Sequence, residues 1–419
     1  MTKQVSSSAQ LRGALTLAGQ LFDQGTARVH EFHRAISDLP LTVVPKALGL
    51  EAGVKSTQLT HDTITDGVYG AIRAVGGAFF KTADVAIKAT ERNFGLQSIG
   101  STVRAPASAT RANLVSAISG LIGDAMAQER NPLAPKLGVY VQGHRVALTT
   151  ASLAAEFPAA TGRIVIFAHG LCCNENTWAF YQQPGNAETL PYSERLHTEL
   201  GFSPVMLRYN SGLHISLNGR TAARQIEKLL AHWPVPVTEL NFVGHSMGGL
   251  LARSAIHAAM KAGMGWTKKV RNVICLGSPH LGAPLERVVD RGVAAMNKLA
   301  LSRPLAKVLD VRSVGIRDLG HGFVADEDWK GRERTSLNAD SRTPIPRLAT
   351  AQYHFIGCTL GADADSAINE MIGDGLVQVS SSTAAQLADA DTAVLFSTNH
   401  LRLLNHPAIY QQIRQRLSA

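Results

Sequence analysis

Short apolar runs alternate with segments of helical spacing through the second half of the chain, from residue 163 onward. Continuous apolar runs bounded by turn residues are typical of strands that are buried on both faces. These runs predict strands at 164–168, 205–209, 240–243, 270–276, 353–357 and 393–396, with helices at 221–232, 250–261 and 407–417. The alternation predicts an α/β protein with a largely parallel sheet.

The first 130 residues have a different pattern, in which helical segments are separated by Pro, Gly and Ser. The most periodic segments are 66–90 and 111–127, and in the second the apolar residues Leu114, Ile118, Leu121 and Ala125 share one helical face. Because the polar sides carry few basic residues, we expect these faces to pack against the main domain rather than to bind a membrane. Residues 137–150 then alternate as strands do. We predict an N-terminal helical region at 1–130 and an α/β domain at 131–419.

A long segment at about 284–350 interrupts the alternation of predicted strands and helices. It is helical in character near 286–309 and charged from 326 to 347, and it is too long for a simple connection. We predict a cap or lid inserted into the α/β domain, and a plain surface insertion is the alternative. Apolar residues between 288 and 308 could line a substrate pocket, and the alternative is that they pack within the lid.

The run from Asn241 to Gly249, with the sequence NFVGHSMGG, places a serine between glycines where a predicted strand meets a predicted helix. In G-x-S-x-G the serine takes a strained turn, and the glycines let strand and helix approach each other while the hydroxyl stands exposed. We therefore predict that Ser246 is a catalytic nucleophile. A serine hydroxyl needs an imidazole base and a carboxylate that orients the imidazole.

Two residues after later predicted strands suit these roles. Asp374 lies between two glycines in a tight turn, whereas Asp363 and Asp365 lie in an ordinary polar loop. His400 precedes the last predicted helix, whereas His406 directly precedes Pro407 and is better explained as the start of that helix. We predict Asp374 as the acid and His400 as the base. The alternative for Asp374 is an aspartate that only caps its own turn.

The reaction also needs backbone N–H groups that stabilise the developing oxyanion. Met247 follows the nucleophile directly, and Leu171 follows the His169-Gly170 turn after the strand at 164–168. We predict that the amides of Leu171 and Met247 form the oxyanion hole. His169 and His245 are interpreted as structural residues.

Five motifs together resemble the lipase and esterase branch of the α/β-hydrolase superfamily: His169-Gly-Leu171, Gly244-His-Ser-Met-Gly248, Gly277-Ser-Pro-His-Leu-Gly-Ala-Pro284, Gly373-Asp-Gly375 and His400. Residues 277–284 are similar to the corresponding segment of bacterial triacylglycerol lipases and of inositol-deacylase-like proteins. The resemblance covers about residue 163 to the C-terminus. It implies an α/β-hydrolase fold with a mostly parallel central sheet, and it implies that Ser246, Asp374 and His400 converge in space.

Composition narrows the class of protein. The formal net charge is +9, but Lys and Arg are scattered without a nucleic-acid-binding pattern, so we expect no nucleic-acid partner. The four cysteines lack the paired spacing of a zinc site, and we expect buried thiols and no metal or cofactor, with a Cys172–Cys173 disulfide as the alternative. The chain has no run of about 18 apolar residues and no clear signal peptide, so we expect a cytoplasmic protein. The basic charge leaves peripheral contact with anionic lipid as an open possibility.

The sequence therefore predicts a serine hydrolase that acts on a small-molecule or lipid ester through an acyl-enzyme, with no obligate protein partner. Two alternatives stay open. An acyltransferase would use the same three residues, and a non-catalytic lipid-binding protein would use only the fold.

Overall fold

The computed structural model describes residues 109–131, 133–183, 185–283, 313–331, 342–366, 369, 373–384 and 391–418. Residues Val115–Ala419 belong to one compact unit. The predicted helix at 66–90 and the apolar residues at 288–308 lie outside the described residues. The domain boundary at 130 and the lid at about 284–350 stay predictions.

A sheet of eight strands organises this unit, in the order β2-β1-β4-β3-β5-β6-β7-β8. The strands are β1 (Gly138–Val141), β2 (His144–Arg145), β3 (Arg163–Ala168), β4 (Ser203–Arg208), β5 (Glu239–His245), β6 (Val270–Leu276), β7 (Gln352–Cys358) and β8 (Asp391–Leu395). Neighbouring strands from β3 to β8 are parallel, and β1 is antiparallel to both β2 and β4. The predicted largely parallel sheet is confirmed, and all six strands predicted from apolar runs are present.

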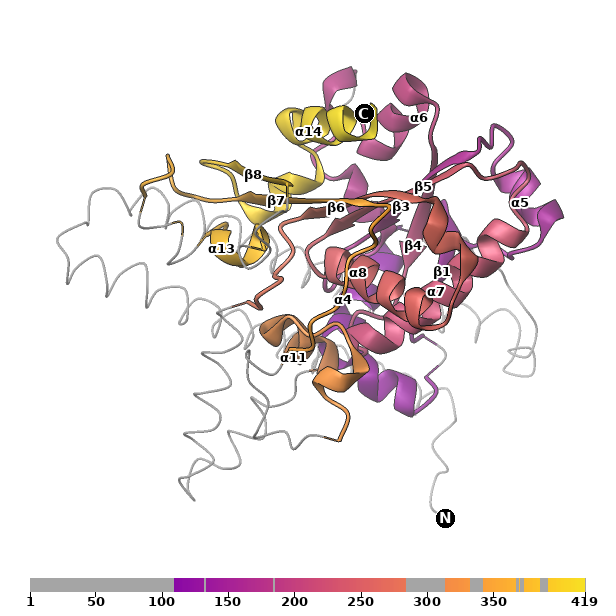
Figure 1. Ribbon diagram of the computed structural model, residues 1–419, viewed down its shortest axis with the longest axis horizontal. Helices are drawn as coiled ribbons and strands as arrows, with labels where there is room; N and C mark the ends of the chain where they lie inside the picture. Colours follow the sequence, from indigo (N-terminus) through magenta and orange to yellow (C-terminus); the bar gives the residue numbers. More distant parts are fainter. Residues whose placement is uncertain are drawn as a thin grey trace, which may run out of the picture. The chain divides into compact units, whose positions relative to one another are not determined.

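Helices cover both faces of the sheet (Figure 1). The helical elements are α4 (Ala109–Gln128), α5 (Thr150–Glu156), η3 (Glu175–Ala179), η4 (Ala187–Thr189), α6 (Tyr192–Leu200), α7 (Ile215–Ala231), α8 (Met247–Lys261), η5 (Gly265–Lys269), α11 (Val314–His321), η6 (Asp326–Asp328), α13 (Val379–Ser382), η9 (His400–Leu404) and α14 (Pro407–Ser418). In Figure 1, α6 and α14 lie on one side of the sheet, and α7 and α8 lie on the other.

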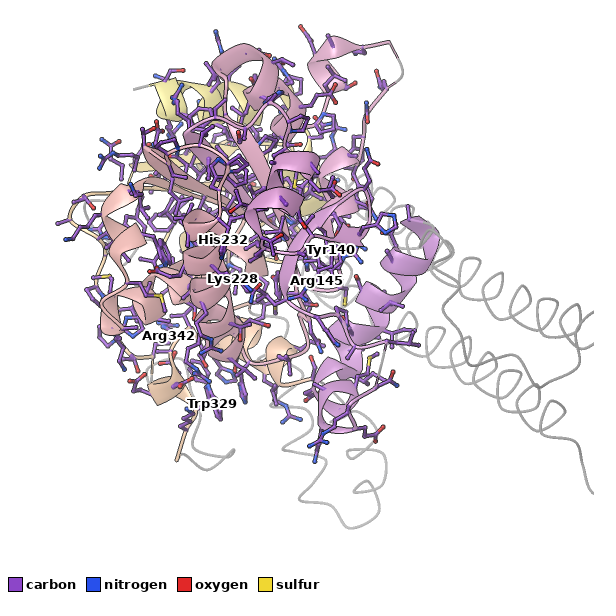
Figure 2. The ribbon with its side chains drawn as sticks, turned by 90° about the vertical axis from the view of Figure 1, so that its right-hand side faces the viewer. Tyr140, Arg145, Lys228, His232, Trp329 and Arg342 are labelled. Carbon is purple, nitrogen blue, oxygen red and sulfur yellow. The ribbon has the colours of Figure 1, made fainter. Side chains whose placement is uncertain are left out.

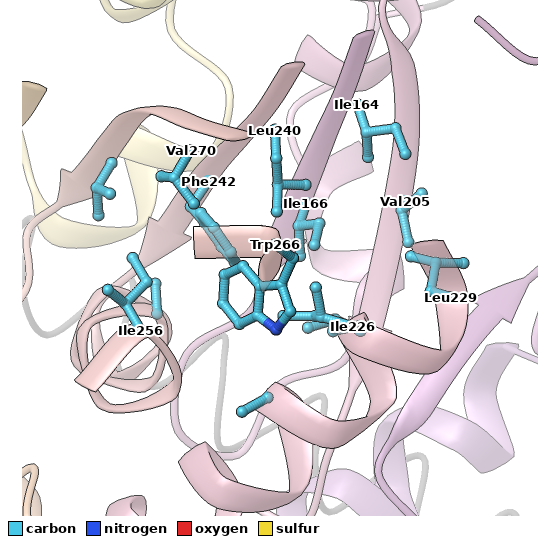
Figure 3. Close-up of a cluster of buried hydrophobic side chains, with 14 of the residues drawn as sticks. Ile164, Ile166, Val205, Ile226, Leu229, Leu240, Phe242, Ile256, Trp266 and Val270 are labelled. Carbon is cyan, nitrogen blue, oxygen red and sulfur yellow. The ribbon is translucent and has the colours of Figure 1, made fainter. Parts of the chain in front are cut away.

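Alternate residues of each central strand feed two separate cores, which explains why the apolar runs are continuous. Ile164 and Ile166 of β3 pack with Ile226 of α7 and with Trp266 (Figure 3). The next residue along the strand, Val165, belongs to the opposite core with residues of α6 and α14. Each fully buried side chain of this size stabilises the fold by about 1.5–3 kcal/mol relative to an exposed one.

The antiparallel edge is shorter than the sequence pattern predicted. Tyr140 of β1 pairs with Arg145 of β2, and Figure 2 shows both side chains at this edge. The strand-like alternation at 137–150 continues past Arg145, but residues 146–149 form no strand. The reason is a helix start: the Thr149 side chain accepts a hydrogen bond from the Ser152 N–H at 3.3 Å and caps α5.

Helix α4 contradicts the predicted packing face. Leu121 is 40% exposed, although we predicted that it packs against the main domain. Within Val115–Ala419, the buried residues of α4 are instead Ser116, Ser119, Gly120, Gly123 and Met126. Small residues let the backbone of α4 come close to the loops that it covers, and an apolar stripe does not identify such a face. The helix is also kinked at Ile122, where φ is −134° and ψ is 23°.

The described part of the long insertion packs on the start of α7. The Asp318 carboxylate of α11 accepts a hydrogen bond from the Ile215 N–H at 2.8 Å and lies 3.1 Å from Nδ1 of His214. The ring of Trp329 stacks on the ring of His214 with centroids 3.7 Å apart. Residues 313–331 therefore pack against the start of α7, one of the helices that cover the sheet.

Candidate active site

Ser246 occupies a sharp turn between β5 and α8. Its φ is 54° and its ψ is −122°, a strained conformation for a residue with a side chain. The turn is held by the Ser246 N–H, which donates to the Leu276 carbonyl of β6 at 2.8 Å. A β-carbon at Gly244 would overlap the backbone at Gly249, and one at Gly248 would overlap the carbonyl oxygen of Ala168. The glycines of the motif are therefore required by close backbone packing around the serine.

Asp374 and His400 form a buried pair. Nδ1 of His400 lies 2.6 Å from Oδ2 of Asp374, and the exposed fractions of the two residues are 4% and 2%. The other carboxylate oxygen of Asp374 accepts hydrogen bonds from the N–H groups of Leu376 at 3.0 Å and Val377 at 2.8 Å. The carboxylate thus holds the Nδ1–H tautomer and leaves Nε2 of His400 as the free base nitrogen.

The competing residues do not reach this pair through any contact in the described residues. Asp363 is exposed, and its carboxylate accepts a hydrogen bond from the Asp365 N–H at 3.1 Å, which is a local turn interaction. His406 accepts a hydrogen bond from the Ala408 N–H at 3.2 Å, at the start of α14. Both contacts are those of local turn and helix-start residues, in line with the interpretation from the sequence.

The His400 ring lies close to the backbone that holds Ser246. A β-carbon at Gly277 would lie 3.0 Å from Cε1 and 3.1 Å from Nδ1 of His400. Gly277 directly follows Leu276, whose carbonyl accepts from the Ser246 N–H. Among the described residues, no hydrogen bond joins the Ser246 hydroxyl to the imidazole. Hydrogen bonds of this kind are often long without substrate and tighten only when it binds.

The two predicted oxyanion donors are backbone N–H groups that have no acceptor within the described part of the chain. Neither the Leu171 amide nor the Met247 amide donates a hydrogen bond to any residue in the described ranges. The turn that contains Leu171 lies against Ser246, because a β-carbon at Gly170 would lie 3.2 Å from Cβ of Ser246. Two unpaired N–H groups near the serine suit the stabilisation of a developing oxyanion.

His169 fixes the orientation of the peptide before Leu171. Its Nδ1 lies 2.8 Å from the Gly170 carbonyl oxygen, and its Nε2 accepts from the Tyr209 N–H at 3.3 Å. Because a carbonyl only accepts, Nδ1 carries the proton and the ring is neutral. Burial lowers the pKa of His169 to about 3, which keeps this tautomer at neutral pH. A trans peptide points its N–H away from its C=O, so holding the Gly170 carbonyl also directs the Leu171 N–H.

Helix α4 reaches the same turn, and the sequence interpretation missed this contact. A β-carbon at Gly120 would overlap Sγ of Cys172, and Nδ2 of Asn174 donates to the Ser116 hydroxyl at 3.3 Å. Further along α4, Nδ2 of Asn210 donates to the Gly123 carbonyl at 2.7 Å. The small residues 116, 119, 120 and 123 follow helical spacing, and this stripe is the signal that could have revealed the contact.

A buried ion pair anchors the segment after the turn. Nε of Arg208 donates to Oε2 of Glu175 at 2.7 Å, and a second guanidinium nitrogen also bonds the carboxylate. Cζ of Arg208 lies 4.1 Å from the centroid of the Tyr140 ring. Arg208 ends β4 and Glu175 starts η3, so the pair connects the sheet to the loop that carries Leu171. Neither residue was singled out from the sequence.

The cysteines beside the site are free thiols. Cys172 and Cys173 form no disulfide, and burial raises the pKa of each thiol to about 12. The disulfide alternative is therefore wrong, and neither sulfur is an activated nucleophile. Within the described residues, no group of three or more His, Cys, Asp or Glu side chains is arranged to hold a metal ion.

A comparison with protein families agrees with this geometry. A family model described as "PGAP1-like alpha/beta domain" matches residues 217–346, a stretch that contains the nucleophile turn. The family-model match and the order of the strands in the sheet support an α/β-hydrolase fold. The predicted fold class and the predicted resemblance to its lipase and esterase branch are thereby confirmed.

The chain is also similar to solved structures of low sequence identity. A lipase of Staphylococcus hyicus has 11% identity and a TM-score of 0.33, over 62% of this chain and 95% of the other. A lipase-esterase related protein of Clostridium acetobutylicum has 11% identity and a TM-score of 0.33, over 61% and 95%. A thioesterase from the prodiginine biosynthetic pathway of Streptomyces coelicolor has 14% identity and a TM-score of 0.34, over 62% and 87%. The comparison with curated proteins gave no match.

None of the helices in the described part of the chain combines the length and apolar character needed to cross a membrane.

Proposed function

We propose that the protein is a serine carboxylic-ester hydrolase in which Ser246, Asp374 and His400 form the catalytic triad. The observation that carries the proposal is the buried Asp374–His400 pair, with Nδ1 and Oδ2 2.6 Å apart. This bond commits Nδ1 to the carboxylate, so the remaining ring nitrogen is available to the serine of the strained turn. Through the same bond the Asp374 carboxylate orients the imidazole of His400.

The proposed reaction has two halves. As Oγ of Ser246 attacks the ester carbonyl carbon, Nε2 of His400 takes the hydroxyl proton, and the negative carbonyl oxygen accepts hydrogen bonds from the Leu171 and Met247 amides. The intermediate then expels the alcohol, which receives the proton from Nε2. In the second half Nε2 takes a proton from water, the hydroxide attacks the acyl-enzyme, and the acid leaves as Ser246 regains its proton. These steps use protein groups and water alone.

Exposed apolar side chains on segments that follow the carboxyl ends of strands support a hydrophobic or lipid ester as substrate. Large apolar side chains that are exposed include Leu121 and Ile122 of α4, Phe180, Tyr181, Leu217, Leu376 and Phe396, and Leu133 is the one other in the described residues. These seven lie on α4 beside the Leu171 turn or on segments that follow the carboxyl ends of strands, and the same edge carries the triad residues. We therefore include peripheral contact with a lipid surface in the proposal.

The test of the proposal is hydrolysis of p-nitrophenyl esters with acyl chains from acetyl to palmitoyl, by the purified full chain and by Ser246→Ala. We expect the variant to lose about 10⁶-fold in turnover while keeping its fold, because the triad acts as a unit. The chain-length optimum distinguishes a short-chain esterase from a lipase. Substantial activity in folded Ser246→Ala would contradict the assignment of the nucleophile.

Two further readouts separate the remaining functions. Product analysis with added alcohol distinguishes hydrolysis from acyl transfer, because a transferase releases a new ester instead of the acid. Labelling by a fluorophosphonate probe tests whether Ser246 is reactive at all, and an unlabelled but folded protein would leave only a non-catalytic role. Sedimentation with phosphatidylglycerol vesicles, compared with phosphatidylcholine vesicles, tests the lipid contact.

A further inference from the structure

His245 connects the nucleophile turn to the catalytic base. It is the last residue of β5 and directly precedes Ser246, and its ring is buried with 1% of the residue exposed. Its Nε2 lies 3.1 Å from the main-chain carbonyl oxygen of His400, which is 155 positions away in the sequence. The centroids of the two imidazole rings are 4.7 Å apart. The His245 side chain therefore links the backbone next to Ser246 to the backbone of His400.

The partner of His245 determines its tautomer. A carbonyl oxygen can only accept, so Nε2 of His245 must carry the proton and donate it. Burial, together with the neighbouring His400, holds the pKa of His245 well below its usual range, so the ring is neutral. Its Nδ1 is then unprotonated, and it is buried without a hydrogen-bond partner in the described part of the chain. The ring is held by a single hydrogen bond, and that bond goes to His400.

The main chain of His400 is held on both sides. Its N–H donates to the Asp374 carbonyl at 3.1 Å, and its own carbonyl accepts from His245. The side chain is held separately by the Asp374 carboxylate. Asp374 thus controls the rotation of the ring, whereas His245 ties the position of the His400 backbone to the residue beside Ser246. Little room is left for the His245 ring to move, because a β-carbon at Gly170 would already lie 3.2 Å from its Nδ1.

We propose that His245 is a positioning residue, which sets the distance between the His400 imidazole and Ser246 by donating a hydrogen bond to the His400 carbonyl. This inference rests on the proposed function, since it assigns a role only if Ser246 and His400 react together. The physical reason is that proton transfer depends steeply on geometry, and a misplacement of about 1 Å costs on the order of 10²-fold in rate. The base is positioned from the nucleophile's own backbone, so movements of surrounding loops do not change their separation.

The test compares His245→Leu with His245→Gln in ester hydrolysis. Leucine fills similar volume but donates nothing, so we expect kcat to fall by about 10-fold to 10²-fold with KM changed by less than about twofold. The amide nitrogen of glutamine reaches the position of Nε2 and can donate, so His245→Gln should recover most of kcat. His257→Leu on α8 is the matched control, because it removes another histidine whose Nδ1 is buried and unpartnered, and it should leave kcat unchanged.

A double-mutant cycle separates positioning from general stability. If His245 acts through His400, His245→Leu should cause no further loss in a His400→Ala background. An equal loss in both backgrounds, or a wild-type kcat in His245→Leu, would overturn the inference. Should His245→Leu fail to fold, the comparison of His245→Gln with the shorter His245→Asn takes its place, and equal rates in these two would also overturn it. Ser246→Ala is measured alongside, so that failure of the positioning role can be told apart from failure of the proposed function. Hydrolysis that does not depend on Ser246 would contradict the proposed function and, with it, any role for His245.

Discussion

Asp374 holds His400 through two separate groups: its carboxylate lies 2.6 Å from Nδ1 of the ring, and its main-chain carbonyl accepts from the His400 N–H at 3.1 Å. The side-chain bond requires a group that accepts from Nδ1–H and stabilises the imidazolium. The carboxylate also accepts hydrogen bonds from the N–H groups of Leu376 and Val377. The side-chain oxygen of an asparagine at this position could still accept these two bonds.

Asp374→Asn should therefore abolish most activity without unfolding the protein. An amide that turns its nitrogen toward His400 favours the wrong tautomer, and we expect a loss of about 10⁴-fold in kcat. The control is Asp363→Asn, which keeps its local turn and should retain activity. Ester hydrolysis and circular dichroism of both variants check the prediction, and equal losses would contradict the assignment of Asp374.

Gly170→Ala should reduce kcat with little effect on stability. The added methyl group would lie 3.2 Å from both Cβ of Ser246 and Nδ1 of His245, so these side chains or the oxyanion turn must shift by a few tenths of an ångström. We expect a loss of about 10-fold to 10²-fold in kcat because oxyanion donors act only when well aligned. Gly265→Ala is the control, since no atom lies within 4 Å of its added methyl group. Unchanged hydrolysis by Gly170→Ala would mean that the turn does not form part of the site.

Gly248→Ala should act on stability rather than on chemistry. Its methyl group would overlap the Ala168 carbonyl oxygen, which belongs to a central strand and cannot move aside as a flexible side chain can. Overpacking of this kind typically costs about 1–3 kcal/mol, and a backbone clash lies at the upper end. Urea unfolding should show a free energy of unfolding lower by about 3 kcal/mol, or no folded protein. A value within about 0.5 kcal/mol of wild type would show that helix α8 can retreat from the sheet.

The neutral His169 should make stability fall as the pH falls. Its pKa is lowered to about 3 by burial, against about 6.5 in the unfolded chain, so below about pH 6.5 the unfolded state binds a proton that the folded state does not. Between pH 7 and pH 5 this histidine alone should lower the free energy of unfolding by about 2 kcal/mol. Urea unfolding at pH 7 and pH 5 measures this change. In His169→Gln the free energy of unfolding should fall by about 2 kcal/mol less between the two pH values than in the wild type. Burial also lowers the pKa of His245 and of His280, so both histidines make stability fall as the pH falls, as His169 does. Their contributions are the same in the wild type and in His169→Gln, and they cancel when the two proteins are compared.

Most of the secondary structure could be predicted because its signals are local. The runs at 164–168 and 270–276 are continuous because neighbouring side chains face opposite cores, and both became strands. Residues 111–127 became helix α4, but its buried face was predicted wrongly. The apolar residue Leu121 is exposed, whereas Gly120 is buried against Cys172, because close approach of two backbones selects for small side chains rather than for apolar ones.

The nucleophile turn and the order of the triad candidates were readable from the sequence for a similar reason. A serine between glycines at a strand–helix junction predicts a strained local turn from neighbouring residues alone. Ser246 has the positive φ of 54° that this motif predicts. The Asp374 turn is also local, with positive φ at Gly373 and Gly375. The sequence by itself thus determined the class of fold, the nucleophile candidate and the residues from which the acid and base would come.

Only the tertiary structure decided which of these residues meet and what holds them. The bond from His245 to the His400 carbonyl, the Arg208–Glu175 pair and the contact of Gly120 with Cys172 each join segments that lie far apart along the chain. Hydrogen bonds of this kind leave no periodic pattern, because a donor and an acceptor are each compatible with many partners. They exist here because the parallel order of β3, β5, β6, β7 and β8 brings the carboxyl ends of these strands, and the loops that follow them, to one edge of the sheet.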